Sequence, residues 1–215
     1  TEAEFGAALK LHPEWRSQIE LVTKCGIIHV CDQKPAHYTK AYDFTKAHIL
    51  QSAEDSLRNL QTDYLDVMLL HRPDLLMDPD EVAEAFELLY SSGKVRSFGV
   101  SNFTPSQIKL LQSTVPVGVH QLEISVKDVS AFDDGRLDQC TLDGIVPMAW
   151  SPLGGGNLPE GVASVLGSLA SEFGVTPQAI ALAWLLQHPA GILPVIGTTK
   201  AENLEAAQTA LNIKL

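Results

Sequence analysis

The chain has 215 residues, 45% of them hydrophobic and 19% charged, which is enough for one sizeable core. Its 15 basic and 26 acidic residues give a net charge of -11, which argues against a partner such as nucleic acid. Three cysteines without a CxxC motif indicate neither a disulfide framework nor a zinc site, and they fit a reducing compartment. No apolar span of membrane length and no secretory leader is present, so we expect no membrane association and, by default, a cytoplasmic location.

The two ends of the chain read as the interior of a longer sequence. Residues 1–9 have helical composition from the outset, without a polar leader or an initiator methionine. Residues 212–215 stop without a closing helix and give the same impression. We therefore expect that further residues precede Thr1.

The first half of the chain alternates between predicted strands and helices. We expect strands over residues 19–24, 65–70 and 95–100 and helices over residues 46–60 and 80–90. Residues 25–45 form a long polar connection between the first strand and the first helix. Thr45 is placed to cap the first of these helices, and Ser92-Gly93 closes the second. The apolar run 65–70 ends abruptly in His71, as a strand buried on both faces does when it enters a polar loop.

The second half continues this alternation. We expect strands over residues 117–125, 145–150 and 192–196. Helices are expected over residues 104–112, 133–143, 161–173, 177–188 and 200–211. Thr104 before Pro105 is a favourable helix start, and Thr199 with Glu202 predicts a capping box for the last helix. Strands separated by helices indicate parallel pairing with helical crossovers.

Two α/β architectures fit this order, a doubly wound sheet and a β/α barrel. A doubly wound nucleotide-binding fold usually carries GxGxxG after its first strand, and this chain has none there. In a barrel, ligands bind where many strands end, and there the chain places Lys24, His71, Ser101, Asn102, Gln121, Glu123, Trp150, Ser151 and Gly197. We therefore predict a (β/α)8 TIM barrel, a single domain over residues 1–215 with about six of the units present and two preceding Thr1.

Four segments resemble, in the same order, signatures of the aldo-keto reductase superfamily, particularly its bacterial oxidoreductase branch. These segments are Leu69 to Asp74, Gly93 to Phe103, His120 to Ser125 and Trp150 to Gly156. The resemblance implies a barrel that binds NADP(H) in extended form and reduces aldehydes or ketones, a small-molecule carbonyl substrate, to alcohols.

The resemblance also implies roles for individual side chains. Lys24 and His71 match the catalytic lysine and histidine: the ammonium lowers the pKa of a tyrosine that supplies the proton, and the imidazole hydrogen-bonds the carbonyl oxygen. Ser101, Asn102 and Gln121 match the groups that hold the nicotinamide carboxamide, and Trp150 stands where a ring stacks on the nicotinamide. Taken singly, Lys24 could be an exposed lysine, and His71 and Trp150 could be core residues; their co-occurrence at strand ends favours function.

Two further segments contain candidate cofactor-binding residues, and each of them could instead have a purely structural role. Ser151, Leu153, Gly154 and Gly155 form either a simple turn or a backbone that approaches a pyrophosphate closely. Gly197, Thr198, Thr199 and Lys200 either cap the last helix or offer a helix N-terminus and a cation to the 2′-phosphate of NADP.

The chain departs from the family pattern at two places. His120 stands where the family usually has asparagine, so it is left out of the cofactor set. The family's catalytic aspartate and tyrosine precede the helix that begins this chain, and no tyrosine of the chain (Tyr38, Tyr42, Tyr64, Tyr90) matches that motif. The 215 residues alone are therefore expected to be inactive as a reductase.

Two other functions stay open beside the reductase. The first is a non-catalytic nucleotide-binding or regulatory barrel, like the potassium-channel β-subunit relatives. The second is a defective, aggregation-prone fragment. The presence of both Lys24 and His71 favours the enzyme.

Overall fold

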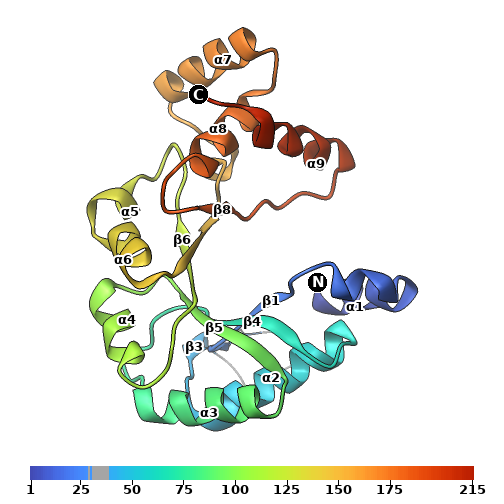
Figure 1. Cartoon of the computed structure of the whole chain (residues 1–215), viewed down its shortest axis with the longest axis vertical. Coiled ribbons are helices and arrows are strands. Elements are labelled where there is room, and N and C mark those ends of the chain that lie inside the picture. Colours follow the sequence, from blue (N-terminus) through green and yellow to red (C-terminus); the bar gives the residue numbers. More distant parts are fainter. Residues whose placement is uncertain (29, 31–38) are drawn as a thin grey trace. The chain divides into compact units, whose positions relative to one another are not determined.

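Residues 1–28, 30 and 39–215 are described by a computed structural model (Figure 1). This part of the chain forms two units, Thr1–Val119 and His120–Leu215, each with its own strands and helices. Cys31 and Tyr38 lie outside the described residues. The single domain expected over the whole chain stays a prediction.

The first unit follows the predicted order of strands and helices. Its helices are α1 (Glu2–Leu11), α2 (Lys46–Leu60), α3 (Pro79–Ser91) and α4 (Pro105–Gln112), with a 3-10 helix at Pro13–Ser17. Its strands are β1 (Val22–Cys25), β2 (Ile27–Ile28), β3 (Ala41–Tyr42), β4 (Leu65–Leu70) and β5 (Val95–Ser101). β1, β4 and β5 pair in parallel in that order, as helical crossovers require. β2 and β3 form a separate antiparallel pair, which the polar composition of residues 25–45 does not predict.

The helices of this unit cover one face of the β1-β4-β5 sheet. Thr23 and Ser56 of α2 are hydrogen-bonded, with 3.2 Å between the hydroxyl oxygens, and Phe98 stacks on Phe86 of α3 with ring centroids 3.9 Å apart. Figure 1 shows α2 and α3 on this side of the strands. Because side chains alternate along a strand, the residues adjacent to Thr23 and Phe98 point to the opposite face.

β4 is buried over its whole length, as its continuous apolar sequence predicts. Met68 and Leu69, on opposite faces of the strand, are both fully buried. Burial of such a side chain stabilises a fold by roughly 1.5–3 kcal/mol. The strand that leads to His71 is therefore one of the best-anchored segments of the first unit.

α1 packs directly on the backbone of α2. A Cβ atom at Gly6 would lie 2.1 Å from the carbonyl oxygen of Asn59, so only glycine fits at this crossing. The Glu2 carboxylate accepts hydrogen bonds from Thr23 Oγ1 at 2.6 Å and from Ser56 Oγ at 2.9 Å. The beginning of α1 is thus tied to both β1 and α2.

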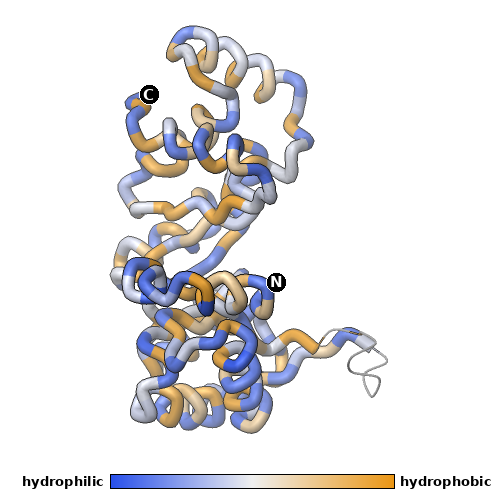
Figure 2. Tube along the Cα trace, turned by 90° about the vertical axis from the view of Figure 1, so that its right-hand side faces the viewer, coloured by the Kyte–Doolittle hydropathy of each residue, from blue (hydrophilic) through white to orange (hydrophobic). Residues whose placement is uncertain are grey.

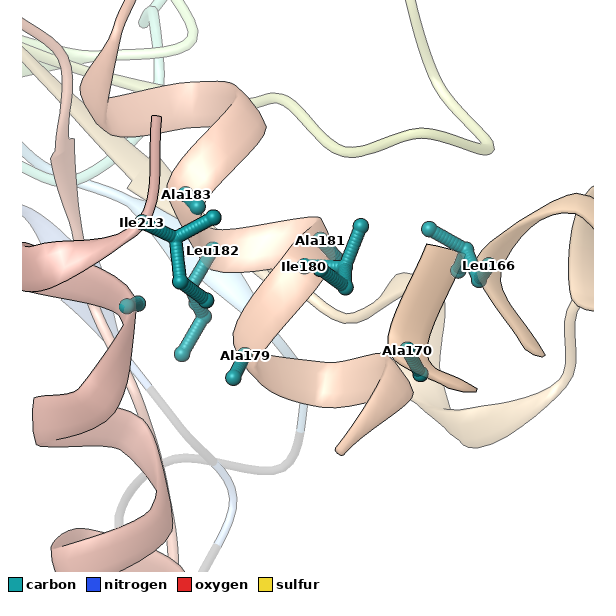
Figure 3. Close-up of a cluster of buried hydrophobic side chains, with 9 residues drawn as sticks. Leu166, Ala170, Ala179, Ile180, Ala181, Leu182, Ala183 and Ile213 are labelled. Carbon is teal, nitrogen blue, oxygen red and sulfur yellow. The ribbon is translucent and has the colours of Figure 1, made fainter. Parts of the chain in front are cut away.

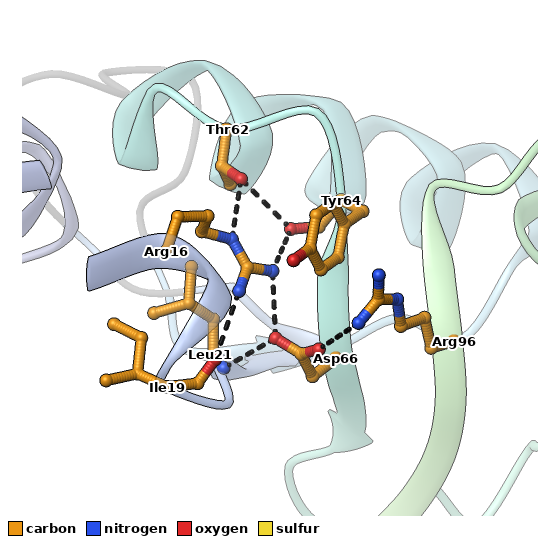
Figure 4. A network of polar contacts seen from close by, with 7 residues as sticks. All are labelled: Arg16, Ile19, Leu21, Thr62, Tyr64, Asp66 and Arg96. Atoms are coloured by element: carbon orange, nitrogen blue, oxygen red, sulfur yellow. Dashed lines mark hydrogen bonds and ion pairs between the residues drawn. The ribbon is translucent and has the colours of Figure 1, made fainter. Parts of the chain in front are cut away.

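A polar network joins the amino-terminal ends of the strands in this unit (Figure 4). The buried Asp66 carboxylate accepts hydrogen bonds from Arg16 Nη2 at 2.8 Å, from Arg96 Nη1 at 3.0 Å and from the Leu21 amide at 2.9 Å. Both guanidinium groups lie over the Tyr64 ring, at 3.6 Å for Arg16 and 3.8 Å for Arg96. Charge pairing and hydrogen bonding together satisfy the buried carboxylate.

The second unit also alternates strands with helices. Its strands, β6 (Val119–Glu123, entered from the first unit), β7 (Val146–Trp150) and β8 (Leu193–Pro194), are ordered β6-β7-β8, and β7 pairs with β8 in parallel. Its helices are α5 (Ser130–Asp133), α6 (Arg136–Asp143), α7 (Glu160–Phe173), α8 (Pro177–Leu186) and α9 (Ala201–Gln208), with 3-10 turns at Gly154–Gly156 and Thr209–Asn212. The single helix predicted over 133–143 is wrong at its start, because Gly135 has φ 83° and separates α5 from α6.

The core of the second unit centres on α8 (Figure 3). Figure 3 shows Leu166 and Ala170 of α7 on one side of α8 and Ile213 on the other. Hydrophobic and hydrophilic residues alternate along the helices of both units (Figure 2), as expected for helices that bury one face. No single helix among the described residues is long and apolar enough to cross a membrane; α7 and α8 pass that composition test only as a pair bent by 94°.

Helix capping follows the sequence at two of the three predicted starts. The Thr45 side chain accepts a hydrogen bond from the His48 amide, and Thr104 forms a complete capping box with Gln107. The capping box predicted at Thr199 is wrong: α9 begins after Lys200, and no side-chain cap bond is formed there.

Candidate functional site

Lys24, His71 and Ser101 lie on one side of the β1-β4-β5 sheet. Lys24 pairs with Leu69 of β4, and Leu69 pairs with Gly99 of β5. Paired residues, and residues two positions apart in a strand, point to the same face. Lys24, His71 and Ser101 therefore share the face opposite α2 and α3, at the carboxyl ends of three neighbouring strands.

Lys24 is half-buried within β1. Burial lowers the pKa of Lys24, because loss of solvent disfavours its ammonium form. A partly desolvated ammonium interacts more strongly with a nearby anion than an ammonium in bulk water does. The predicted role of Lys24 uses its ammonium form, which a phenolate beside it would favour.

His71 and Asn102 occupy the turns that follow β4 and β5. The His71 amide donates a 2.9 Å hydrogen bond to the Cys25 carbonyl, which anchors His71 beside the end of β1. Asn102 has φ 61°, a left-handed conformation that few residues other than glycine adopt. Its Nδ2 donates a 2.8 Å hydrogen bond to the Oγ of Ser101, whose side chain is almost fully buried. Unusual backbone conformations of this kind concentrate at functional sites.

Tyr64 and Tyr90 do not offer a phenol beside Lys24, and the third described tyrosine, Tyr42, lies in β3 opposite Ile27. Tyr64 precedes β4 and lies between the guanidinium groups of Arg16 and Arg96, at the opposite end of the strand from His71. Tyr90 is exposed near the end of α3.

Gln121 and Trp150 share a structural position in the second unit. Leu122 of β6 and Ala149 of β7 are buried in the helix-side core of this unit. Alternation along each strand directs Gln121 and Trp150 to the other face. Gln121 is 4% exposed and Trp150 is half-buried at the end of β7.

A pocket of about 750 Å³ lies within the second unit and collects five of the predicted cofactor residues. These five are Ser151, Leu153, Gly155, Gly197 and Thr198. Apolar and small side chains of α8 and α9 line the pocket, among them Ala181, Leu182, Ala206 and Ala207. Polar side chains of Gln178 and Asn203 also line it. The remaining predicted residues of this unit, Gln121, Trp150, Gly154, Thr199 and Lys200, are not part of its lining.

The turn after β7 has a backbone that admits little besides glycine. Ser151 has φ 49°, and Gly154, Gly155 and Gly156 all have positive φ. A Cβ atom at Gly154 would lie 2.8 Å from Leu158 Cδ2, so a larger residue would also collide. Two amides of this turn are used within it: the Gly154 amide donates to the Ser151 carbonyl at 2.8 Å and the Gly156 amide to the Leu153 carbonyl at 3.2 Å. The turn lies directly beside the pocket, since Ser151, Leu153 and Gly155 line it.

The loop before α9 is organised by Thr198. Its Oγ1 accepts hydrogen bonds from the Lys200 amide at 3.1 Å and from Asn203 Nδ2 at 3.0 Å. Thr199 and Lys200 are exposed, and Lys200 stands at the N-cap position of α9. The threonine that shapes this turn is thus one residue earlier than the sequence indicates. Among the described residues no ion pair engages the Lys200 ammonium, which stands at the helix N-terminus.

His120 has an environment that its sequence position does not predict. It is fully buried, its Nδ1 lies 3.9 Å from Cys140 Sγ, and its Nε2 has no hydrogen-bond partner within the described chain. Burial lowers the pKa of His120 to about 3, with a further contribution from the Arg136 charge that Asp134 partly opposes. A neutral imidazole at this position packs α6 against β6.

The whole chain matches the model of the Aldo/keto reductase family, over residues 1–215. It is 47% identical to "Uncharacterized oxidoreductase YcsN" of Bacillus subtilis and 42% identical to "6-dehydroglucose reductase" of Agrobacterium fabrum. All of this chain is matched in both cases, together with 75% and 74% of the respective relatives. The chain thus spans about three quarters of their length.

Solved structures give the same assignment. A thermostable aldo-keto reductase in complex with the inhibitor epalrestat is 29% identical with a TM-score of 0.87, matching all of this chain and 73% of that one. An aldo/keto reductase from Klebsiella pneumoniae in complex with NADP and acetate is 30% identical with a TM-score of 0.83, matching all of this chain and 71% of that one. These matches confirm the predicted fold class, a (β/α)8 barrel of which this chain holds about six units. The chain belongs to the aldo/keto reductase family of oxidoreductases.

Proposed function

We propose that the protein is an NADPH-dependent reductase of aldehydes or ketones. The observation that carries this proposal is the placement of Lys24, His71 and Ser101 on one face of β1-β4-β5, at the strand ends. Family membership supports it, as do a relative named 6-dehydroglucose reductase and a structure of a Klebsiella pneumoniae relative with NADPH. No observation favours the non-catalytic alternative.

Lys24 and His71 act on the carbonyl group in this proposal. His71 donates a hydrogen bond to the carbonyl oxygen, which stabilises the negative charge that develops there. Lys24 favours the phenolate form of a tyrosine brought next to it, so that this tyrosine transfers its proton at neutral pH. NADPH supplies the hydride that the carbonyl carbon receives.

The second unit holds the cofactor's adenosine and phosphate groups. The pocket lined by Leu153, Gly155, Gly197 and Thr198 accepts the adenosine, whose ring suits the small apolar side chains of α8 and α9. Ser151 and Gly154 belong to the turn that approaches the diphosphate. Thr199 and Lys200 bind the 2′-phosphate at the start of α9.

Four residues bind the nicotinamide end in this proposal. Ser101, Asn102 and Gln121 hydrogen-bond its carboxamide, and each has a polar side-chain atom suited to that task. Trp150 stacks on the ring through its indole face. The convergence of these residues on one cleft stays a prediction.

Binding and turnover are tested separately. Fluorescence titration of the 215 residues should show NADPH binding. Turnover is measured with the 215 residues preceded by a segment that supplies the family's aspartate and tyrosine, as aldehyde-dependent loss of NADPH absorbance. NADPH binding without turnover in that longer protein contradicts the reductase proposal and favours the regulatory alternative; absence of NADPH binding contradicts both.

A further inference from the structure

Lys127 lies against the glycine turn that follows β7. A Cβ atom at Gly154 would be 3.2 Å from Lys127 Cβ and 3.3 Å from Lys127 Cδ, so the lysine stem runs alongside this turn. The Lys127 amide donates a 3.1 Å hydrogen bond to Ser125 Oγ, and Ser125 is almost fully buried. The backbone from which the stem extends is therefore held in place.

The Lys127 ammonium has no competing partner in the part of the chain that the structure describes. No ion pair or hydrogen bond engages its Nζ among the described residues, and the residue is exposed. The neighbouring Asp128 carboxylate instead accepts hydrogen bonds from the Ser130 amide at 3.0 Å and from Ser130 Oγ at 2.6 Å. The charge is thus available to an anionic ligand.

Cations are scarce in the second unit. Residues 120–215 contain four, Lys127, Arg136, Lys200 and Lys214, against ten acidic residues, a balance of 4 - 10 = -6. Arg136 is already bound to Asp134, with 2.6 Å between Nε and Oδ2. A dinucleotide phosphate that enters this acidic unit must therefore rely on very few positive side chains.

The position of Lys214 removes it from the pocket. Its neighbour Leu215 donates an amide hydrogen bond of 3.0 Å to Gln187 Oε1, at the carboxyl end of α8. The pocket is lined by the amino-terminal half of that helix, Pro177 to Leu182. Lys127 and Lys200 remain, one beside the glycine turn after β7 and one at the start of α9, and both of these segments contribute residues to the pocket.

We propose that Lys127 is the cation that binds the diphosphate bridge of the nicotinamide dinucleotide. This inference rests on the proposed function, because it assumes that the pocket receives the cofactor. The dinucleotide carries its anionic groups at two places, the diphosphate bridge and the 2′-phosphate, and the second unit offers one lysine near each candidate segment. A lysine on a four-carbon stem binds phosphate as a point charge and needs no fixed geometry. Gly154 has a second role here, since the space left by its missing side chain accommodates the stem of Lys127.

The test uses fragments that separate the two anionic groups. Dissociation constants of NADPH, NADH, ADP-ribose and 2′-AMP are measured for the protein and its Lys127→Ala, Lys127→Arg and Lys200→Ala variants. Lys127→Ala should weaken NADPH, NADH and ADP-ribose by about tenfold and leave 2′-AMP unchanged, because only the first three carry the diphosphate. Lys127→Arg should retain most of the affinity, and Lys200→Ala should weaken only NADPH and 2′-AMP.

The matched control is Lys109→Ala, which removes an exposed lysine of α4 in the first unit and should change none of the four constants. Unchanged affinity of the Lys127→Ala variant for ADP-ribose and NADH would overturn the assignment of Lys127 while leaving the proposed function intact. Equal weakening of 2′-AMP and ADP-ribose would overturn it as well, since the effect would then not depend on the diphosphate. A parent protein that binds no dinucleotide contradicts the proposed function itself.

Discussion

The amide of His71 donates a hydrogen bond of 2.9 Å to the carbonyl oxygen of Cys25, the residue that follows Lys24. This bond extends the β1–β4 ladder one residue beyond the register pair of Cys25 and Leu70. The two predicted catalytic side chains are therefore fixed to one another through the backbone, so either side chain can be replaced without moving the other.

The first prediction concerns these two side chains. We expect His71→Ala and Lys24→Met to lower kcat for aldehyde reduction by roughly 10²–10⁴-fold, the usual contribution of acid–base and polarising groups. Steady-state kinetics in the longer protein that supplies the tyrosine measures this loss. NADPH affinity should change little, and Lys10→Met, at an exposed position of α1, should behave like the parent. If kcat were undiminished in both variants, Lys24 and His71 would have no part in the chemical step.

The second prediction concerns cofactor preference. Lys200→Ala should weaken NADPH by about 1 kcal/mol or more and leave NADH nearly unchanged, because only NADPH carries the 2′-phosphate. Lys200 stands at the N-cap of α9, where the helix dipole adds to its charge. Parallel titrations of both cofactors provide the measurement, and an equal loss for both would remove this residue from the 2′-phosphate site.

The third prediction concerns pH and His120. Its pKa of about 3 lies below the ordinary value of 6.5, chiefly because burial disfavours the imidazolium and secondarily because of Arg136. Between these pH values the unfolded state binds the proton and the folded state does not, so stability falls as pH drops from 6.5 towards 3. The slope is at most about 1.4 kcal/mol per pH unit.

His120→Asn should abolish that part of the acid sensitivity. Urea unfolding at several pH values between 3 and 7 measures it. His12→Asn, at an exposed site before the first 3-10 helix, serves as control and should keep the parent slope. A His120→Asn protein with the same pH dependence as the parent would show that the buried imidazole does not control it.

The fourth prediction concerns the network around Asp66. Arg16→Met should reduce the free energy of unfolding by about 3 kcal/mol, since removing one partner of a buried ion pair leaves the other charge under-compensated. Arg16 also donates to Thr62 Oγ1 and to the Tyr64 carbonyl, both at 2.8 Å, and these bonds would be lost. Chemical denaturation measures the change against Arg58→Met, which removes an exposed ion pair of α2 and should cost under about 1 kcal/mol. Similar losses for both variants would mean that the network contributes no more than a surface pair.

The sequence correctly predicts helices whose starts carry strong local signals. It does not predict a helix boundary that depends on one backbone torsion angle. Thr45 and Thr104 cap their helices because a hydroxyl before a favourable first turn is a local property. The separation of α5 from α6 depends on the positive φ of Gly135, which composition does not reveal. The apolar run predicts a last strand over residues 192–196, yet the strand paired with β7 is Leu193–Pro194, because an apolar run alone does not fix pairing length.

Those residues of the candidate site that lie at strand ends can be predicted from the sequence, because the strand ends themselves can be predicted. Lys24 and His71 follow from the rule that polar residues at the carboxyl ends of parallel strands gather at one edge. No motif surrounds Lys127, so the sequence does not single it out; its proposed role depends on the packing of its stem on Gly154, a contact between segments 27 residues apart. The left-handed backbone of Asn102 is likewise a property of the folded turn rather than of the sequence alone.

The contact between Gly6 and the backbone of α2 has a consequence for hydrogen exchange. With main chain against main chain, α1 cannot loosen by side-chain repacking; it stays in place or separates as a whole. Glu2 adds hydrogen bonds to the same neighbours, and these must break in the same event. The amides of α1 therefore open together with its release from α2, as one cooperative unit that exchanges in concert rather than residue by residue.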